Sequence, residues 1–68
     1  MMKPITKTLA TAPTRERITA YVNEYYYSEN YEVLEDGTIH NTKTGRTIDN
    51  ARVVPWRNGY KFVRIQEA

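Results

Sequence analysis

The spacing of hydrophobic and polar positions changes near residue 30 and divides the chain into a helical and a β-rich part. Between residues 15 and 27, apolar and aromatic side chains recur every three or four positions, at Ile18, Tyr21, Val22, Tyr25 and Tyr26. That spacing forms one stripe along a helix. From residue 31 to residue 65, short β-branched and aromatic runs alternate with turns, which is typical of antiparallel strands. We therefore expect an α+β fold, with one helix over about 15–27 packed on a meander of about four strands over about 31–65.

The start of the helix and its tyrosines give further signals. Thr14 can accept a hydrogen bond from a first-turn amide, and Glu16 lies in that turn, where the helix dipole favours an acid. Most of the five tyrosines between residues 21 and 31 are expected to pack in the core with their hydroxyls at its edge. Tyr27 cannot share the stripe and is expected to be exposed or to point into the junction with the first strand. Alternatively, the tyrosines and the glutamates near them form an acidic aromatic recognition surface.

Three glycines mark the turns between the predicted strands: Gly37, Gly45 and Gly59. Each follows Asp, Thr or Asn, as in tight turns. A three-residue first loop pairs Val33 with Ile39, and we prefer it to a two-residue loop because it gathers apolar side chains on one face. Residues 41–46 then form a turn, followed by a short strand at 47–48 and a link at 49–51.

The last hairpin allows two registers. A three-residue loop pairs Trp56 with Tyr60, whereas a two-residue loop pairs Val54 with Val63. Pro55 cannot donate a ladder hydrogen bond, so its strand should be an edge or leave the sheet. Basic and aromatic residues alternate along this ribbon in either register. Such ribbons fit the major groove of DNA, although a half-buried ribbon with charged outer positions is equally consistent with the pattern.

The first thirteen residues contain few large aliphatic side chains. We expect a flexible arm over 1–13 ahead of a single small domain over 14–68. Two alternatives stay open for this arm. It can lie along the sheet as an edge segment, or it can reach a phosphate through Lys3 and Lys7.

Composition excludes several classes of site. The 68 residues correspond to one domain near the lower size limit for a single core. The chain has no cysteine, and its one histidine, His40, has no clustered ligands, so no disulfide, metal, cofactor or enzyme activity is expected. A small domain without such a staple depends on a partner or on self-association, and a homodimer through an exposed edge strand is left open. No apolar run is long enough to span a membrane, and a cytoplasmic location in a bacterium or infected host cell is expected.

Charge is unevenly divided along the chain. Residues 16–36 have a net charge of −5, and residues 37–66 have a net charge of +5. This division is typical of a domain that shows a basic face to an anion and an acidic face elsewhere. The alternative is that the two halves attract each other within the fold. The sequence leaves both interpretations open.

Four motifs in the β-rich part form a recognisable series: Tyr31-Glu32-Val33, Asp36-Gly37-Thr38-Ile39-His40-Asn41, Thr44-Gly45-Arg46 and Asn58-Gly59-Tyr60-Lys61-Phe62-Val63. The series resembles the small β-rich module that precedes the catalytic domain in many phage HNH homing endonucleases. That resemblance implies contact with DNA. The catalytic HNH segment has no counterpart among these residues, so nuclease activity is not implied.

The preferred function is a small non-enzymatic nucleic-acid-binding module of phage or mobile-element type, with duplex DNA as the favoured ligand. The candidate nucleic-acid-binding residues are Lys43, Arg46, Arg52, Arg57, Asn58, Tyr60, Lys61 and Arg64. The alternative is a small phage-encoded inhibitor of the anti-CRISPR or host-takeover type. It would bind a host or defence protein complex through its acidic tyrosine-rich face or its basic ribbon. The candidate partner-binding residues of the acidic face are Glu24, Tyr27, Glu29 and Glu32.

Overall fold

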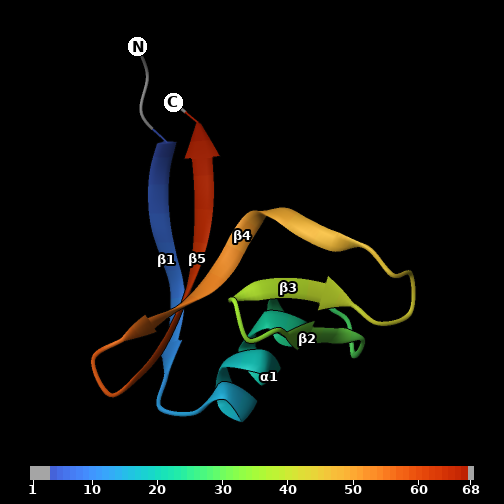
Figure 1. Cartoon of the computed structure of the whole chain (residues 1–68), viewed down its shortest axis with the longest axis horizontal. Helices are drawn as coiled ribbons and strands as arrows, with labels where there is room; N and C mark the ends of the chain where they lie inside the picture. Colours follow the sequence, from blue (N-terminus) through green and yellow to red (C-terminus); the bar gives the residue numbers. More distant parts are fainter. Residues whose placement is uncertain (1–3, 68) are drawn as a thin grey trace.

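The computed structural model describes the backbone of residues 4–67 and the side chains of residues 6–65. Its elements are β1 (Pro4–Ala12), α1 (Arg15–Tyr25), β2 (Tyr31–Val33), β3 (Thr38–Asn41), β4 (Thr47–Trp56) and β5 (Gly59–Glu67). The strands form one antiparallel sheet in the order β1-β5-β4-β3-β2, and α1 packs against β1, β2 and β5 (Figure 1). The predicted α+β class, with one helix on a meander, is confirmed, and the sheet has five strands where about four were expected.

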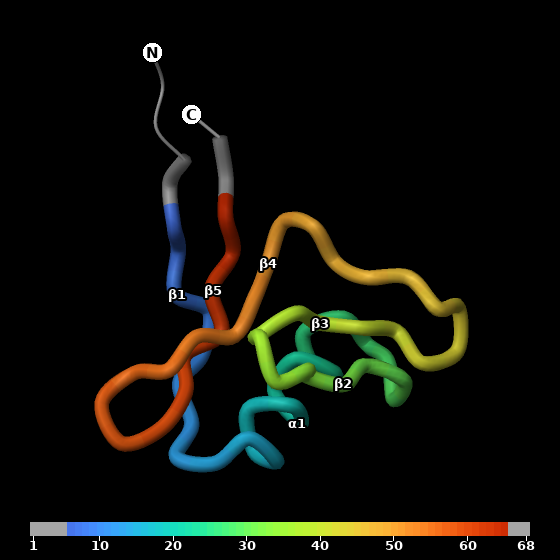
Figure 2. Tube along the Cα trace, in the orientation of Figure 1, coloured from blue at the N-terminus to red at the C-terminus, as the bar shows by residue number. Residues whose placement is uncertain are grey.

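The first strand is the main departure from the sequence analysis. In place of a flexible arm, Pro4–Ala12 pairs with β5 along its length, with Ala12 opposite Tyr60 (Figure 2). The edge-segment alternative describes this part of the chain correctly. Residues 1–3, and Lys3 with them, lie outside the described residues. The threonines of β1 favour extended backbone, but its partner strand is the last one in the sequence, so local patterning gives no sign of the pairing.

The start of α1 follows the prediction. The Arg17 amide donates to Thr14 Oγ1 at 3.1 Å, which makes Thr14 the N-cap, and Glu16 lies in the first turn. Ile18 and Val22 are completely buried and form the core side of the predicted stripe. The apolar stripe therefore orients α1 on the sheet.

The end of α1 comes at Tyr25, two residues earlier than predicted. Tyr27 has a φ of 52°, its amide donates to the Glu24 carbonyl oxygen at 3.2 Å, and the Ser28 amide donates to the Asn23 carbonyl oxygen at 2.9 Å. This pair of bonds is a Schellman motif, in which the left-handed position is usually glycine. Tyr27 occupies that position here and is 97% exposed, as expected for a side chain outside the stripe.

Asn23 joins the helix to the edge strand β2. Its Nδ2 donates to the Tyr31 carbonyl oxygen at 3.0 Å, and its Oδ1 accepts from the Tyr31 amide at 2.8 Å. These are backbone groups that an edge strand leaves without a ladder partner. A helical side chain therefore takes the place of a sixth strand at this point.

The first hairpin has the predicted register. Val33 lies opposite Ile39, and the Gly37 amide donates to the Leu34 carbonyl oxygen at 2.9 Å across the three-residue loop. Gly37 has a φ of 90°, and its carbonyl oxygen accepts from the Val53 amide at 2.9 Å. A Cβ at this position would overlap the Val53 carbonyl oxygen. Glycine is thus needed both for the turn and for its close contact with β4.

β4 is a single bent strand, so the link predicted at 49–51 is wrong. It pairs with β3 only at Thr38 opposite Arg52 and at His40 opposite Thr47, with extra β4 residues between these two pairs. Extra residues on one strand form a bulge, which bends that strand. Figure 1 shows the result, because β4 curves from β5 over to β3.

Both registers predicted for the last hairpin are wrong. Trp56 lies opposite Gly59 and Val53 opposite Phe62, so the loop consists of Arg57 and Asn58. Arg57 has a φ of 51° and takes the positive φ that the pattern assigned to glycine. Relative to the three-residue loop, the one-position shift exchanges the sheet faces of the residues that follow the loop, whereas the two-residue loop would place them on the same faces as observed.

The core lies between α1 and the sheet. Its fully buried side chains are Phe62, Ile18, Ile39 and Val22. Tyr26 and Tyr31 pack partly buried against it, with ring centroids 5.0 Å apart. Burial, with a smaller effect of the neighbouring Tyr25, raises the pKa of the Tyr26 phenol. Tyr21, Tyr25 and Tyr27 are exposed, so the expectation that most of these tyrosines would be core residues is not met.

Candidate nucleic-acid interface

The β4–β5 hairpin has two chemically different faces. Directly opposed residues share a face, and Val53 with Phe62 lies on the side packed against α1. The other side contains Arg52, Val54, Trp56, Lys61 and Val63, and we call it the outer ribbon face. The order of strands and the alternation of side chains therefore separate an apolar side from a side with two cations and a tryptophan.

The tip of the outer ribbon face contains a cation–aromatic cluster. The Arg57 guanidinium carbon lies 4.7 Å from the centre of the Trp56 ring, and Lys61 Nζ lies 5.6 Å from it. Both distances are within the range of cation–π attraction. Trp56 is still 38% exposed. The tip thus presents two cations around an accessible aromatic ring, a combination that suits phosphates and bases.

Arg57 adopts an unfavourable backbone conformation at this tip. Of the non-glycine residues that the structure describes, only Tyr27 and Arg57 have positive φ. A left-handed conformation costs a non-glycine residue roughly 1–2 kcal/mol, and the exposed side chain of Arg57 gains no burial in return. Strained residues cluster at binding sites. The conformation projects the guanidinium over Trp56 at the end of the ribbon.

Two of the predicted nucleic-acid-binding residues, Lys43 and Arg46, lie far from this tip. Lys43 and Arg46 belong to the β3–β4 turn, which Figure 1 places at the other end of the longest axis of the domain, 36 Å in extent. Asn41 Oδ1 accepts from the amides of Lys43 and Thr44, at 2.9 and 3.1 Å. These amides are therefore occupied by the turn itself, and the structure does not bring the turn together with the hairpin tip.

Two other predicted nucleic-acid-binding residues, Tyr60 and Arg64, lie on the helix side of the hairpin. Arg64 Nη1 donates to the Tyr25 hydroxyl at 3.3 Å, and the Tyr60 ring lies 6.0 Å from the Arg15 guanidinium carbon. Both contacts are with α1. Arg64 and Tyr60 thus share no face with Lys61, because side chains alternate along β5, and Trp56 lies on the face of Lys61 in the observed register.

Arg52 and Asn58 are the remaining candidate nucleic-acid-binding residues. Asn58 is exposed in the hairpin loop, next to Arg57. Arg52 is exposed on the outer ribbon face and lies near Asp36. The hydrogen bonds from Thr38, with a smaller contribution from Arg52, hold the pKa of the Asp36 carboxyl below its usual value. Arg52 is thus a further exposed cation on the outer ribbon face, behind the tip.

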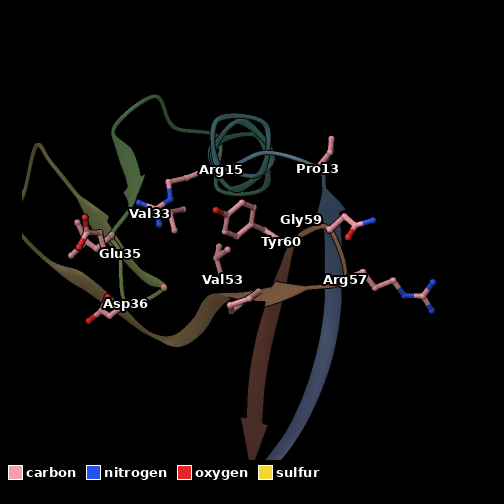
Figure 3. Close-up of a pocket in the computed structure, with 13 residues that line it drawn as sticks. Pro13, Arg15, Val33, Glu35, Asp36, Val53, Arg57, Gly59 and Tyr60 are labelled. Carbon is pink, nitrogen blue, oxygen red and sulfur yellow. The ribbon is translucent and has the colours of Figure 1, made fainter.

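A cleft of about 540 Å³ adjoins the tip, between the first hairpin loop, the start of α1 and the last hairpin. Figure 3 shows Tyr60 pointing into this cleft and Arg57 pointing away from it. Glu35 and Asp36 line its other side. The cleft therefore lacks the excess of positive charge that an anion site requires, and the exposed ribbon remains the better candidate.

The acidic aromatic candidates are only partly gathered. Glu24, Tyr27 and Glu29 line a shallow hollow of about 650 Å³ at the end of α1. Glu32 lies in β2 opposite His40, and its neighbour Val33 is the one that packs toward the core. Three of the four predicted partner-binding residues thus share a surface, and Glu32 faces elsewhere.

Sequence reasoning left one central residue out of the candidate set. Trp56 was recognised as part of the ribbon but not as a site residue, although Arg57 follows it directly and Lys61 lies on the facing strand. Among the described residues, no group of three or more His, Asp or Glu side chains is placed to hold a metal ion. The described part of the chain also contains no helix that is long and apolar enough to cross a membrane.

The chain matches no family model, no curated protein and no solved structure. Its resemblance to the module of phage HNH endonucleases therefore stays a prediction from short motifs. Among the described surfaces, the hairpin tip has the chemistry best suited to a nucleic acid.

Proposed function

We propose that this chain is a small non-enzymatic nucleic-acid-binding module that contacts its ligand with the tip of the β4–β5 hairpin. The observation that supports this proposal is the cluster of Trp56 with Arg57 and Lys61 on a face that α1 does not cover. Two cations near one exposed ring attract a phosphate backbone, and the ring offers a flat surface to a base or sugar. Duplex DNA is the favoured ligand, because a two-stranded ribbon fits its major groove.

The residues at the tip have different roles in this proposal. Arg57 and Lys61 neutralise phosphates, and each releases condensed counterions on binding. Asn58 lies at the end of the loop, where its amide can pair with a base edge. Arg52 adds a further cation behind the tip on the same face. Lys43 and Arg46 have no part in this contact, because they lie at the other end of the domain.

The proposal is tested by fluorescence anisotropy of labelled duplex DNA, single-stranded DNA and RNA across a salt series. In log–log form, the salt slope for duplex DNA has a magnitude of about 0.9 per phosphate neutralised. The double variant Arg57→Ala/Lys61→Ala is expected to reduce that slope by up to about 1.8. The matched control, Lys43→Ala/Arg46→Ala, removes the same charge at the distant turn and should leave most of the slope intact.

Two results would overturn the proposal. The first is a failure to bind any of the three nucleic acids at low salt. The second is an equal loss of slope in the two double variants, because binding would then depend on total charge and not on the hairpin tip.

A second candidate function is inhibition of a host or defence protein complex through the acidic aromatic surface of Glu24, Tyr27 and Glu29. The observation in its favour is the strained, almost fully exposed Tyr27 among carboxylates. The variant Glu24→Gln/Glu29→Gln separates the two functions. It should leave DNA binding intact, and it should weaken a complex with a protein partner only if this second function holds.

A further inference from the structure

Two cations face each other across the ladder between β1 and β5. Lys7 lies directly opposite Arg64, whose Nη1 donates to the Tyr25 hydroxyl of α1 at 3.3 Å. Directly opposed residues share a face, so both cations are on the helix side of the sheet, and like charges in such positions destabilise the pairing. Within residues 6–12 and 59–65 the two strands contain no acid that could offset this repulsion. An anion bound between the two side chains would remove it.

This pair lies where the β4–β5 ladder ends. The register between β4 and β5 stops at Ala51 opposite Arg64, and beyond that point β1 and β5 extend away from the rest of the domain as a two-stranded ribbon (Figure 1). The Lys7 side chain is exposed, that of Arg64 is partly buried, and Tyr25 is 41% exposed. A ligand can therefore reach both cations from the helix side.

The groups around the pair suit a phosphate. The Tyr25 hydroxyl accepts from Arg64 and still has its own proton to donate. An ammonium, a guanidinium and a hydroxyl together offer the donors that phosphate oxygens accept. Glu24 of α1 lines a separate groove with Leu9 and Tyr25, and neither cation of the pair belongs to that lining. The acid on this side of the sheet thus leaves the space between the two cations open to an anion.

The pair faces away from the hairpin tip. Lys61 lies on the outer ribbon face, and Arg64, three positions further along β5, lies on the helix side because alternate side chains point to opposite faces. A duplex that rests on the outer ribbon face, with its phosphates at Arg57 and Lys61, has the sheet between itself and Lys7. A phosphate held by the pair therefore belongs to a different nucleic-acid molecule.

We propose that Lys7, Arg64 and Tyr25 form a second phosphate site, through which the domain holds a second duplex and links it to the first. This inference rests on the proposed function, because the hairpin tip holds the first duplex. It also gives a role to Arg64, which the observed register separates from the tip. Two cationic sites on opposite faces allow one copy of the chain to bridge two duplexes without self-association.

A capture assay tests the second site. One duplex is fixed to beads through biotin, and the wild-type chain should retain a second, fluorescent duplex on them in a salt-sensitive manner. Lys7→Ala/Arg64→Ala should reduce this capture by about tenfold or more, while anisotropy shows that the variant still binds a single duplex through the tip. Lys7→Arg/Arg64→Lys keeps both charges and should retain capture. Lys43→Ala/Arg46→Ala removes the same charge at the distant turn and should retain it as well.

Circular dichroism verifies that each variant is folded. Duplex binding that depends on the tip, without capture of a second duplex, would overturn this inference and leave the proposed function standing. Capture that is unchanged in Lys7→Ala/Arg64→Ala would overturn it too, because the link would then come from another surface or from self-association. If inorganic phosphate shifts the amide resonances of Lys7 and Arg64 but no duplex is captured, the site takes free phosphate and the bridging proposal fails. Absence of all duplex binding would overturn both proposals.

Discussion

Gly59 lies so close to Ala12 that the site has no room for a side chain. A Cβ on Gly59 would overlap the Ala12 carbonyl oxygen and lie 2.8 Å from the Cα of Pro13. Gly59 has no positive φ, so its role is to let β5 approach the end of β1 and not to form the turn. This close approach joins the last hairpin to the first strand.

Gly59→Ala is therefore expected to destabilise the protein by about 1–3 kcal/mol, the usual cost of overpacking. Urea unfolding followed by circular dichroism measures the change. Asn58→Ala alters the adjacent exposed loop residue and should shift the free energy of unfolding by no more than about 0.5 kcal/mol. If the two variants are equally stable, the close packing at Gly59 does not contribute to the free energy of unfolding.

Tyr27→Gly is expected to raise stability. The residue occupies the left-handed position of the Schellman motif and is 97% exposed, so glycine removes strain and gives up almost no packing. The gain should be about 1 kcal/mol, the lower end of the cost of a left-handed residue with a Cβ. Tyr27→Ala keeps that Cβ and should change little in thermal unfolding. A loss of stability in Tyr27→Gly would show that the ring contributes to packing after all.

Asn23→Ala should detach the edge strand β2 from α1. The substitution removes two hydrogen bonds to the Tyr31 backbone, each worth about 1 kcal/mol, and an overall loss of about 2 kcal/mol is expected. Amide hydrogen exchange at Tyr31 should accelerate in step with this loss. In Asn23→Asp the acceptor for the Tyr31 amide is kept and the donor is lost, so an intermediate effect is expected. Unchanged exchange at Tyr31 in Asn23→Ala would contradict this account of the strand edge.

The first hairpin should contribute to acid sensitivity through Asp36. Its Oδ1 accepts from the Thr38 amide at 2.9 Å, and the pKa of the carboxyl is lower in the folded chain than its ordinary value of 3.8. A lowered folded-state pKa gives stability that is present above 3.8 and is lost as the pH falls through the folded-state value. Asp36→Asn keeps an acceptor but does not titrate. Its unfolding midpoint should vary less with pH below 4 than that of the wild type, and an identical pH profile would contradict this role.

Local rules predicted the parts of the fold that short segments determine. The first hairpin register follows from a three-residue loop with Gly37 at positive φ, and the N-cap follows from Thr14 and the stripe after it. The pairing of β1 with β5 joins the two ends of the chain, so no local pattern could reveal it. A run of threonines between two prolines is compatible with a strand and with a mobile arm alike.

The last hairpin shows why the candidate site was only partly predicted. The Asn58-Gly59 pattern predicts a positive φ at Gly59, but Arg57 takes it, and glycine is required at position 59 by its close contact with Ala12. The resulting register places Tyr60 and Arg64 on the helix side and Lys61 with Trp56 on the outer ribbon face. The basic, aromatic character of the ribbon was readable from the sequence, whereas the choice among hairpin registers depended on which loop residue takes the positive φ.

The most direct test of the nucleic-acid interface uses the fluorescence of Trp56, which is the single tryptophan of the chain and lies at the proposed contact. Duplex DNA should quench or shift this emission, with a midpoint that coincides with the anisotropy curve and weakens with salt. The response should be lost in Arg57→Ala/Lys61→Ala and kept in Lys43→Ala/Arg46→Ala. DNA binding by anisotropy with unchanged Trp56 emission would contradict the account, because the ligand would then lie on another face.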